Sequence, residues 1–351
     1  IMDAIESRGG YLNAATSREY TTLYVRMLKK HVGVGVEILA DILINSTFPD
    51  MEKERGVILE EIASIEDTPD ELAHDILSEF HWPNHALGRP VSGYANTVAT
   101  LSHEDIQQFY NTWYKPSNMV FSIAGNFNEA DVLAQVTEIF NKLPSEDAPC
   151  LDSAPSFQAG IQVVERPISQ THISIAMPGP SALDEKRYLC SLLTGVLGGG
   201  STSRLFEIIR EQEGLAYNIY AYHINHIPVG MTGIYEAVAP NNAKRALELT
   251  FKELRRMREE PITPEELDRS REQLKGGMLM ALENTYTRMA RMAKGLLFNN
   301  RIIPIEEIVD HIDAVTIMSI QEFAQQHFQQ DSCALLLLGP AGTWTPEEIE
   351  L

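Results

Sequence analysis

One predicted helix carries two acidic residues on its apolar face. At about 100° per residue, one arc of the helix over residues 54–65 is filled by Val57, Ile58, Ile62 and Ile65, with Leu59 beyond its edge. Glu54 and Glu61 lie inside that arc, about 20° apart around the axis and two turns apart along it. An apolar face is normally buried, and a buried carboxylate without a partner is costly. The pattern therefore indicates a cation, a metal or a bound proton at these acids, or else a shallow helix whose two acids reach water.

Periodic apolar positions predict helices and strands along the whole chain. Two predicted helices begin with a Thr cap, Pro at the first helical position and Glu at the third, at Thr68–Glu71 and Thr263–Glu266. In the first half we expect strands at 11–16, 20–27 and 118–124, and helices at 29–46, 50–66, 69–80 and 102–112. In the second half we expect strands at 161–165, 170–176, 216–224, 228–237 and 332–338, and helices at 183–197, 202–212, 240–258, 263–283, 285–296, 304–312 and 316–328.

The two halves of the chain repeat one design. The predicted helix at Phe109 and the strand after it align without a gap with those at Phe323, an offset of 214 residues. A looser pairing sets Gly10–Asn13 against Gly214–Tyr217. These matches keep the same order, and they predict two homologous α+β domains, each a mostly antiparallel sheet with helices packed on one face.

The repeat also bears on the two acids of the first paragraph. Pro49 and Pro264 each precede a predicted helix and pair at an offset of 215 residues. At that offset neither Glu54 nor Glu61 has an acidic counterpart, so the shared fold does not require them. A Pro-, Ser- and Asp-rich stretch marks the boundary between the halves. We expect domains at 1–145 and 159–351, joined by a linker at 146–158.

Composition narrows the classes of partner. The 351 residues carry a net charge of −21, which argues against nucleic acid and against an anionic membrane as partners. No apolar run is long enough to span a bilayer. The 3 cysteines have no metal-binding or redox spacing, which favours a reduced, intracellular compartment.

Segments spread over nearly the whole chain carry a resemblance to one family. The sequence resembles the pitrilysin/insulinase family of zinc metallopeptidases, and most of all the small two-domain processing peptidases of bacteria and mitochondria. The segments that carry the resemblance are Gly9–Thr21, Glu54–Ile62, Leu87–Pro90, Tyr114–Met119, Gly198–Phe206, Arg210–Tyr217 and Gln273–Gly276.

The resemblance implies a Zn²⁺ cofactor. In the family, two His of an inverted His-x-x-Glu-His helix and one Glu of a later helix hold the metal; Glu61 matches that Glu, and Glu54 matches a second acid that supports catalysis. This chain contains no His-x-x-Glu-His. Its nearest patterns, His81–His85 and His223–His226, lack the Glu, and we do not expect them to bind metal. By the family's order of segments, the motif would lie just ahead of Ile1.

The second half supplies a further pair by resemblance. Arg210 and Tyr217 match two residues that the second domain contributes across a cavity between the domains. An Arg and a phenol can hydrogen-bond the scissile carbonyl oxygen as it becomes an oxyanion. The sequence alone leaves a plainer alternative open, a surface helix Arg and a core strand Tyr.

Two further segments match substrate-binding parts of the family. Asn13 and Ala14 match the edge strand on which an extended peptide lies, although an ordinary edge strand would have the same sequence. The glycines Gly198–Gly200 resemble a glycine-rich segment that lines the substrate cavity, with a flexible loop ahead of the helix at Ser201 as the alternative. They lack the Lys-Ser/Thr of a phosphate-binding loop.

The resemblance implies an endopeptidase that hydrolyses short or unfolded polypeptides. We expect the complete protein to be active and this chain alone to be inactive. The alternative is a non-catalytic pitrilysin-like subunit that binds peptides or a partner chain. A homodimer or a second pitrilysin-like subunit is the expected assembly, and the bacterial cytoplasm is the expected location, with the mitochondrial matrix as the alternative.

Overall fold

The chain packs into two compact units, each built from three separate segments. The computed structural model describes residues 1–143, 146–149, 153–340, 344, 346 and 349. The predicted domain boundaries stay a prediction, and part of the predicted linker, 150–152, lies outside the described residues. Unit 1 comprises residues 1–62, 91–152 and 281–303, and unit 2 comprises residues 63–90, 153–280 and 304–351.

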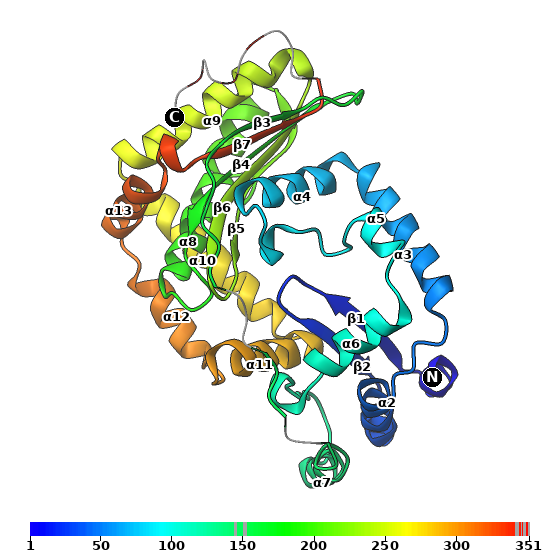
Figure 1. Cartoon of the computed structure of the whole chain (residues 1–351). Coiled ribbons are helices and arrows are strands. Elements are labelled where there is room, and N and C mark those ends of the chain that lie inside the picture. Colours follow the sequence, from blue (N-terminus) through cyan, green and yellow to red (C-terminus); the bar gives the residue numbers. More distant parts are fainter. Residues whose placement is uncertain (144–145, 150–152, 341–343, 345, 347–348, 350–351) are drawn as a thin grey trace. The chain divides into compact units, whose positions relative to one another are not determined.

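Unit 1 contains one two-stranded hairpin and several helices (Figure 1). Strand β1 (Tyr11–Thr16) pairs antiparallel with β2 (Thr21–Arg26) over its whole length. Helix α2 contacts both β2 and α7. The helices of this unit are α1 (Met2–Glu6), α2 (Val32–Ile44), α3 (Met51–Glu66, whose last residues belong to unit 2), α5 (Ala95–Val98), α6 (His103–Trp113), α7 (Glu129–Phe140) and α11 (Thr285–Asn299).

Unit 2 is built on a five-stranded sheet in the order β3-β7-β4-β6-β5. Only the β3–β7 pair is parallel. The mixture of helices with mostly antiparallel strands confirms the predicted α+β class. The strands are β3 (Gly160–Val164), β4 (Thr171–Gly179), β5 (Ala216–Asn225), β6 (Gly230–Val238) and β7 (Ala334–Leu338), and the α-helices are α4 (Pro69–His81), α8 (Lys186–Gly198), α9 (Ala243–Glu259), α10 (Pro264–Ala281), α12 (Ile305–Ala314) and α13 (Ile317–His327).

Helices cover both faces of the unit 2 sheet (Figure 1). The larger core joins Ile175 and Leu337 of the sheet to helices α8, α9 and α13. The smaller core joins Tyr235 and Leu336 on the opposite face to Leu77 of α4. Successive residues of a strand face opposite sides of the sheet. Since helices cover both sides, the sequences of β4, β6 and β7 are nearly continuous apolar runs. The cover by α4 was not anticipated from the sequence, which assigns that helix to the first half.

Local cap chemistry fixes several helix starts. At Thr263 the predicted reciprocal cap is present: the Glu266 N–H donates to Thr263 Oγ1 at 3.2 Å, and the Thr263 N–H donates to Glu266 Oε2 at 2.8 Å. At Thr68 the hydroxyl instead donates to the Ser64 carbonyl at 2.7 Å. That carbonyl belongs to the last turns of α3, so the Thr68 hydroxyl is turned toward the end of one helix and accepts no backbone N–H of the next.

Two predictions in the first half need correction. Residues 119–124 form no strand, although 118–124 was predicted as one, and the helix α7 was not predicted. An isolated strand leaves its backbone groups unpaired, and in the described part of unit 1 the only sheet is the β1–β2 hairpin. The corresponding segment of the second half does form a strand, β7, because β3 and β4 flank it.

The structure also shifts the loose pairing of the two halves by one residue. Gly9 and Gly214 both have left-handed backbones, with φ of 67° and 64°. Each closes a helical segment and stands two residues ahead of an edge strand, β1 or β5. At that offset of 205 residues, Asn13 corresponds to Asn218 rather than to Tyr217. None of the described helices is both long and apolar enough to cross a bilayer.

Candidate active site

Glu54 and Glu61 lie on α3 and are both exposed. Val57, in the same arc of the helix, is 45% exposed, and Ile62 is the single buried residue of α3. Arg55 holds the helix in unit 1 by donating to the Val98 carbonyl at 2.6 Å and to the Leu101 carbonyl at 2.8 Å. Of the two interpretations left open by the sequence, the shallow helix is the one that this structure shows.

Among the residues that the structure describes, no strand pairs with the outer edge of β1. Ser17 N–H donates to the Tyr20 carbonyl at 2.8 Å at the turn. Since hydrogen-bonded and non-bonded pairs alternate along an antiparallel ladder, the backbone groups of Ala14 point away from β2. The side chain of Asn13 covers this edge: its Oδ1 accepts the Ala14 N–H at 2.8 Å. An incoming strand would therefore pair with the backbone of Ala14, and the predicted substrate contact of Asn13 and Ala14 stays a prediction.

Arg210 and Tyr217 lie side by side in unit 2. The Cζ atom of Arg210 is 4.6 Å from the centre of the Tyr217 ring and 4.7 Å from that of Phe206. Tyr217 is 80% exposed. No ion pair or hydrogen bond joins the Arg210 guanidinium to another described residue. An Arg flanked by two rings, with free donors on its edge, is suited to bind an anion or an oxyanion.

Arg210 and Tyr217 each lie at an irregularity of the backbone. Arg210 lies in a π-helix, Phe206–Gln212, in which Glu213 N–H reaches the Ile208 carbonyl at 3.0 Å. Tyr217 lies at a β-bulge between Ala216 and Asn218. A bulge re-aims a side chain and interrupts the alternation of a strand, and Tyr217 and Asn218 are accordingly both exposed. Both irregularities are frequent at functional sites. Phe206 was missed from the sequence, although its spacing of four residues from Arg210 is a helical contact spacing.

The glycines Gly198–Gly200 have different surroundings. A Cβ at Gly198 would lie 2.3 Å from the Ala221 backbone nitrogen, so only glycine lets α8 approach β5 this closely. A Cβ at Gly199 would lie 2.7 Å from Gly195 Cα. A Cβ at Gly200 would meet nothing within 4 Å. Helix packing accounts for the first two glycines, and the predicted substrate contact of all three stays a prediction.

Replacing Gly198 by Ala should lower the free energy of unfolding by about 1–3 kcal/mol, the usual cost of overpacking. Urea unfolding followed by circular dichroism measures this change. Gly200→Ala is the matched control, and we expect a change within about 0.5 kcal/mol. Equal stability of the two variants would contradict the close approach of α8 to β5.

Two family models match the chain. Residues 1–94 match the model described as insulinase (peptidase family M16), and residues 100–274 match that of the peptidase M16 inactive domain. The "uncharacterized zinc protease YmxG" of Bacillus subtilis is 33% identical over 344 residues, covering 97% of this chain and 84% of the relative. The chain belongs to peptidase family M16, the insulinase or pitrilysin family.

Solved structures share the M16 fold of this chain. The peptidase M16 inactive domain from Pseudomonas fluorescens has a TM-score of 0.90 at 20% identity, covering 98% of this chain and 84% of that one. A chain of complex III2 from Candida albicans, solved with Inz-5 bound, has a TM-score of 0.85 at 17% identity, covering 95% and 82%. At these identities the likeness shows the fold alone.

The described residues do not form a complete site for the zinc ion expected of an M16 zinc protease. A catalytic zinc has three protein ligands. Glu54 and Glu61 are two turns apart, about 10 Å along the helix, and two acids alone would not complete such a site. Within the described ranges, no three His, Cys, Asp or Glu side chains form a group that could hold a metal. These residues alone therefore do not fit the ion, and Glu61 remains one predicted ligand.

Histidines of the two nearest patterns, His81–His85 and His223–His226, form hydrogen bonds within the fold. His81 is fully buried, and its Nδ1 bonds to the Leu77 carbonyl. His85 Nδ1 accepts the Leu87 N–H at 3.1 Å. His223 Nε2 lies 3.2 Å from Ser191 Oγ. These contacts give the rings packing and capping roles.

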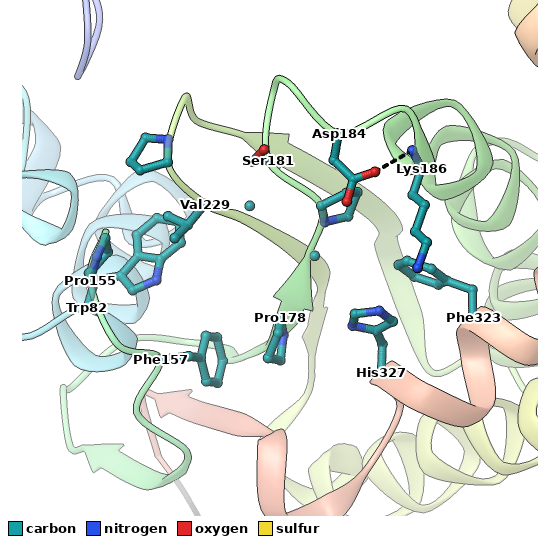
Figure 2. A pocket seen from close by; sticks show the side chains of 14 residues that line it. Trp82, Pro155, Phe157, Pro178, Ser181, Asp184, Lys186, Val229, Phe323 and His327 are labelled. Atoms are coloured by element: carbon teal, nitrogen blue, oxygen red, sulfur yellow. Dashed lines mark hydrogen bonds between the residues drawn. The ribbon is translucent and has the colours of Figure 1, made fainter. Parts of the chain in front are cut away.

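A cavity of about 300 Å³ lies in unit 2 (Figure 2). It is lined by Gly230, at the start of β6, and by aromatic, proline and polar side chains. Tyr217 follows Ala216, which pairs with Val238 at the far end of β6. Val238 is eight residues after Gly230, and at 3.4 Å per residue this separates the two ends of the strand by about 27 Å. Burial, with the nearby charge of Lys186, lowers the pKa of His327 in the cavity wall. This cavity is therefore not where the candidate catalytic pair lies.

Proposed function

We propose that this M16 protein is a zinc-dependent endopeptidase that cleaves short or unfolded polypeptides. The observation that carries the proposal is the guanidinium of Arg210, which has no partner among the described residues and is flanked by Phe206 and Tyr217. In a chain with 49 acidic and 28 basic residues, an Arg that no acid pairs is free to bind a ligand.

The proposed role of Arg210 and Tyr217 is to bind the oxygen of the scissile carbonyl. As a nucleophile adds to the carbonyl carbon, that oxygen gains negative charge. Donors already in place stabilise this charge more than they stabilise the neutral substrate. Arg210 would donate N–H groups from its edge, because rings lie against it, and Tyr217 would donate its O–H.

The proposed role of the β1 edge is to hold the substrate backbone. An extended peptide that adds to the edge pairs its amides with the N–H and C=O of Ala14. Asn13 Oδ1 must first release the Ala14 N–H, which it now accepts. Backbone pairing of this kind accepts many sequences but requires an extended chain, which favours short or unfolded polypeptides over folded proteins.

One residue of this chain is a proposed zinc ligand. We propose Glu61 as a zinc ligand and Glu54 as a supporting acid, on the strength of their match to the family's segment. The remaining ligands must come from outside the described residues, and the metal would supply Lewis-acid chemistry when bound. Both acids are exposed, so neither is engaged in a buried structural contact that would prevent this role.

Changing Glu61 to Gln in the full-length gene product should reduce bound zinc from near one per chain to near zero. Gln keeps the shape but loses the anionic oxygen that zinc prefers. Elemental analysis of the purified protein measures the content without relying on activity. Glu60→Gln, on the adjacent exposed residue, is the matched control and should retain zinc. Equal zinc in wild type and Glu61→Gln would reject the ligand assignment.

The second candidate function is a non-catalytic subunit that binds peptides or a partner chain. It is favoured by the lack of a metal-binding group among the described residues and by the family model of an inactive domain over residues 100–274. Absence of zinc and of peptide cleavage in the full-length product would select this alternative.

Assembly and location complete the proposal. We propose a homodimer or a pairing with a second M16 subunit, in the bacterial cytoplasm, with the mitochondrial matrix as the alternative. The bacterial source of the B. subtilis relative supports the first location. Cys190 and Cys333 are free and buried, which is consistent with a reducing compartment.

A further inference from the structure

An aromatic cluster lies beside the unpaired edge of β1. Tyr11 and Asn13 of β1 share one face of the hairpin with Tyr24 of β2, because alternate residues of a strand face the same side and Asn13 is paired with Tyr24. The Tyr11 and Tyr24 ring centres are 6.1 Å apart. Tyr286, from α11 of the same unit, lies 4.4 Å from the Tyr24 ring. The cluster therefore runs from a helix to the edge of the sheet.

These contacts hold the Tyr11 ring in place. Asn13 Nδ2 donates to the Tyr11 hydroxyl at 2.7 Å, and Tyr24 supports the ring from the neighbouring strand. Tyr11 as a whole residue still has 51% of its surface exposed. An exposed aromatic surface that is already ordered loses little conformational entropy when a ligand covers it.

We propose that Tyr11, supported by Tyr24 and Tyr286, forms a subsite that selects aromatic side chains in the peptide paired with the β1 edge. This inference rests on the proposed function. A residue directly opposite Tyr11 on an added strand has its Cβ about 4.5–5.5 Å away, within reach of the ring. Aromatic pairs across strands are among the stabilising ones.

The charge beside the subsite argues against basic substrate side chains. Arg26 is opposite Tyr11 in the register of the hairpin and is exposed. Since opposite residues share a face, its positive charge lies near the same ring. A Lys or Arg of the peptide would meet like charge there, so the subsite should prefer Phe, Tyr or Trp to a cation.

Binding of labelled peptides to the full-length gene product in EDTA tests this without catalysis. The peptides are eight residues long, blocked at both ends, with Phe, Ala or Lys placed at each position in turn. We expect Phe at one position to bind about two- to fivefold more tightly than Ala, the range of a cross-strand aromatic pair, and Lys no better than Ala. Tyr11→Ser should remove the preference, and Tyr11→Phe, which keeps the ring, should retain it.

Two controls separate this inference from the function on which it rests. Ala14→Pro removes the edge N–H, and proline is tolerated on edge strands. N-methylation of alternate peptide amides removes the same pairing without any change to the protein. If both weaken binding but Phe and Ala peptides bind equally, the subsite is overturned and the edge function stands. If neither weakens binding, or if no peptide binds, the edge function fails and the subsite fails with it.

Discussion

Replacing Arg210 by Ala should lower kcat of the full-length gene product by about 10²–10³-fold, with a much smaller change in KM. This is the cost of removing one oxyanion donor, about 2.7–4 kcal/mol. The loss should fall on kcat because the charge that Arg210 is proposed to bind develops in the transition state. Steady-state cleavage of a quenched fluorescent peptide gives both constants.

A second stacked arginine of unit 2 provides the control. Arg187 Cζ lies 4.4 Å from the Tyr188 ring centre, but its guanidinium donates to the Tyr188 hydroxyl at 2.7 Å. Arg187→Ala should therefore leave kcat within about twofold, because this arginine is already satisfied. Tyr217→Phe should lower kcat by less than Arg210→Ala does, because it removes only the hydroxyl donor. Equal kcat in Arg210→Ala and Arg187→Ala would remove Arg210 from the proposed mechanism.

Raising the pH from 5 to 9 should destabilise this protein through Glu236, and Glu236→Gln should remove that part of the pH dependence. Glu236 on β6 is fully buried. Thr250 donates to its Oε1 at 3.2 Å, and no described residue forms a hydrogen bond with its Oε2. Burial raises the pKa of Glu236 from 4.5 to about 8. The difference corresponds to a loss on the order of 4–5 kcal/mol of unfolding free energy.

The sign follows from where the proton resides. Below pH 4.5 Glu236 is protonated in both the folded and the unfolded chain. Between 4.5 and about 8 only the folded chain holds the proton, so unfolding releases it and stability falls as pH rises. Above about 8 both states are ionised and the loss is complete.

Urea unfolding at pH 5, 7 and 9 measures the effect as the difference between wild type and Glu236→Gln. The difference should change with pH, whereas Glu322→Gln, on an exposed residue of α13, should track wild type at every pH. Parallel pH profiles for wild type and Glu236→Gln would show that Glu236 is not held protonated by the fold.

Much of the secondary structure could be predicted because its causes are local. Strand β1 and helix α3 have the predicted bounds, at 11–16 and within one residue of 50–66. The Thr263 cap needs only the side chain of Glu266, three residues on. The segments that resemble the M16 family also lie within short windows, so the family could be recognised without the fold.

The errors arose where a segment depends on a distant neighbour. Residues 118–124 have the composition of a buried strand, yet in the described chain no second strand lies beside them. Conversely α4, predicted as a helix of the first half, covers the sheet of unit 2. An amphipathic helix shows that it will be buried, but its sequence does not name the surface that buries it.

For the candidate site, the sequence by itself determined the residue types and, through the family, their candidate roles: Glu61 for zinc, Asn13 and Ala14 for the peptide, and Arg210 with Tyr217 for the oxyanion. Only the tertiary structure decided that Arg210 and Tyr217 touch, because their contact depends on a π-helix and a β-bulge. Each irregularity shifts a side chain by one residue from its regular position. Such shifts are set by the packing of helix and strand against each other and not by periodicity, which is why no pattern along the chain could reveal them.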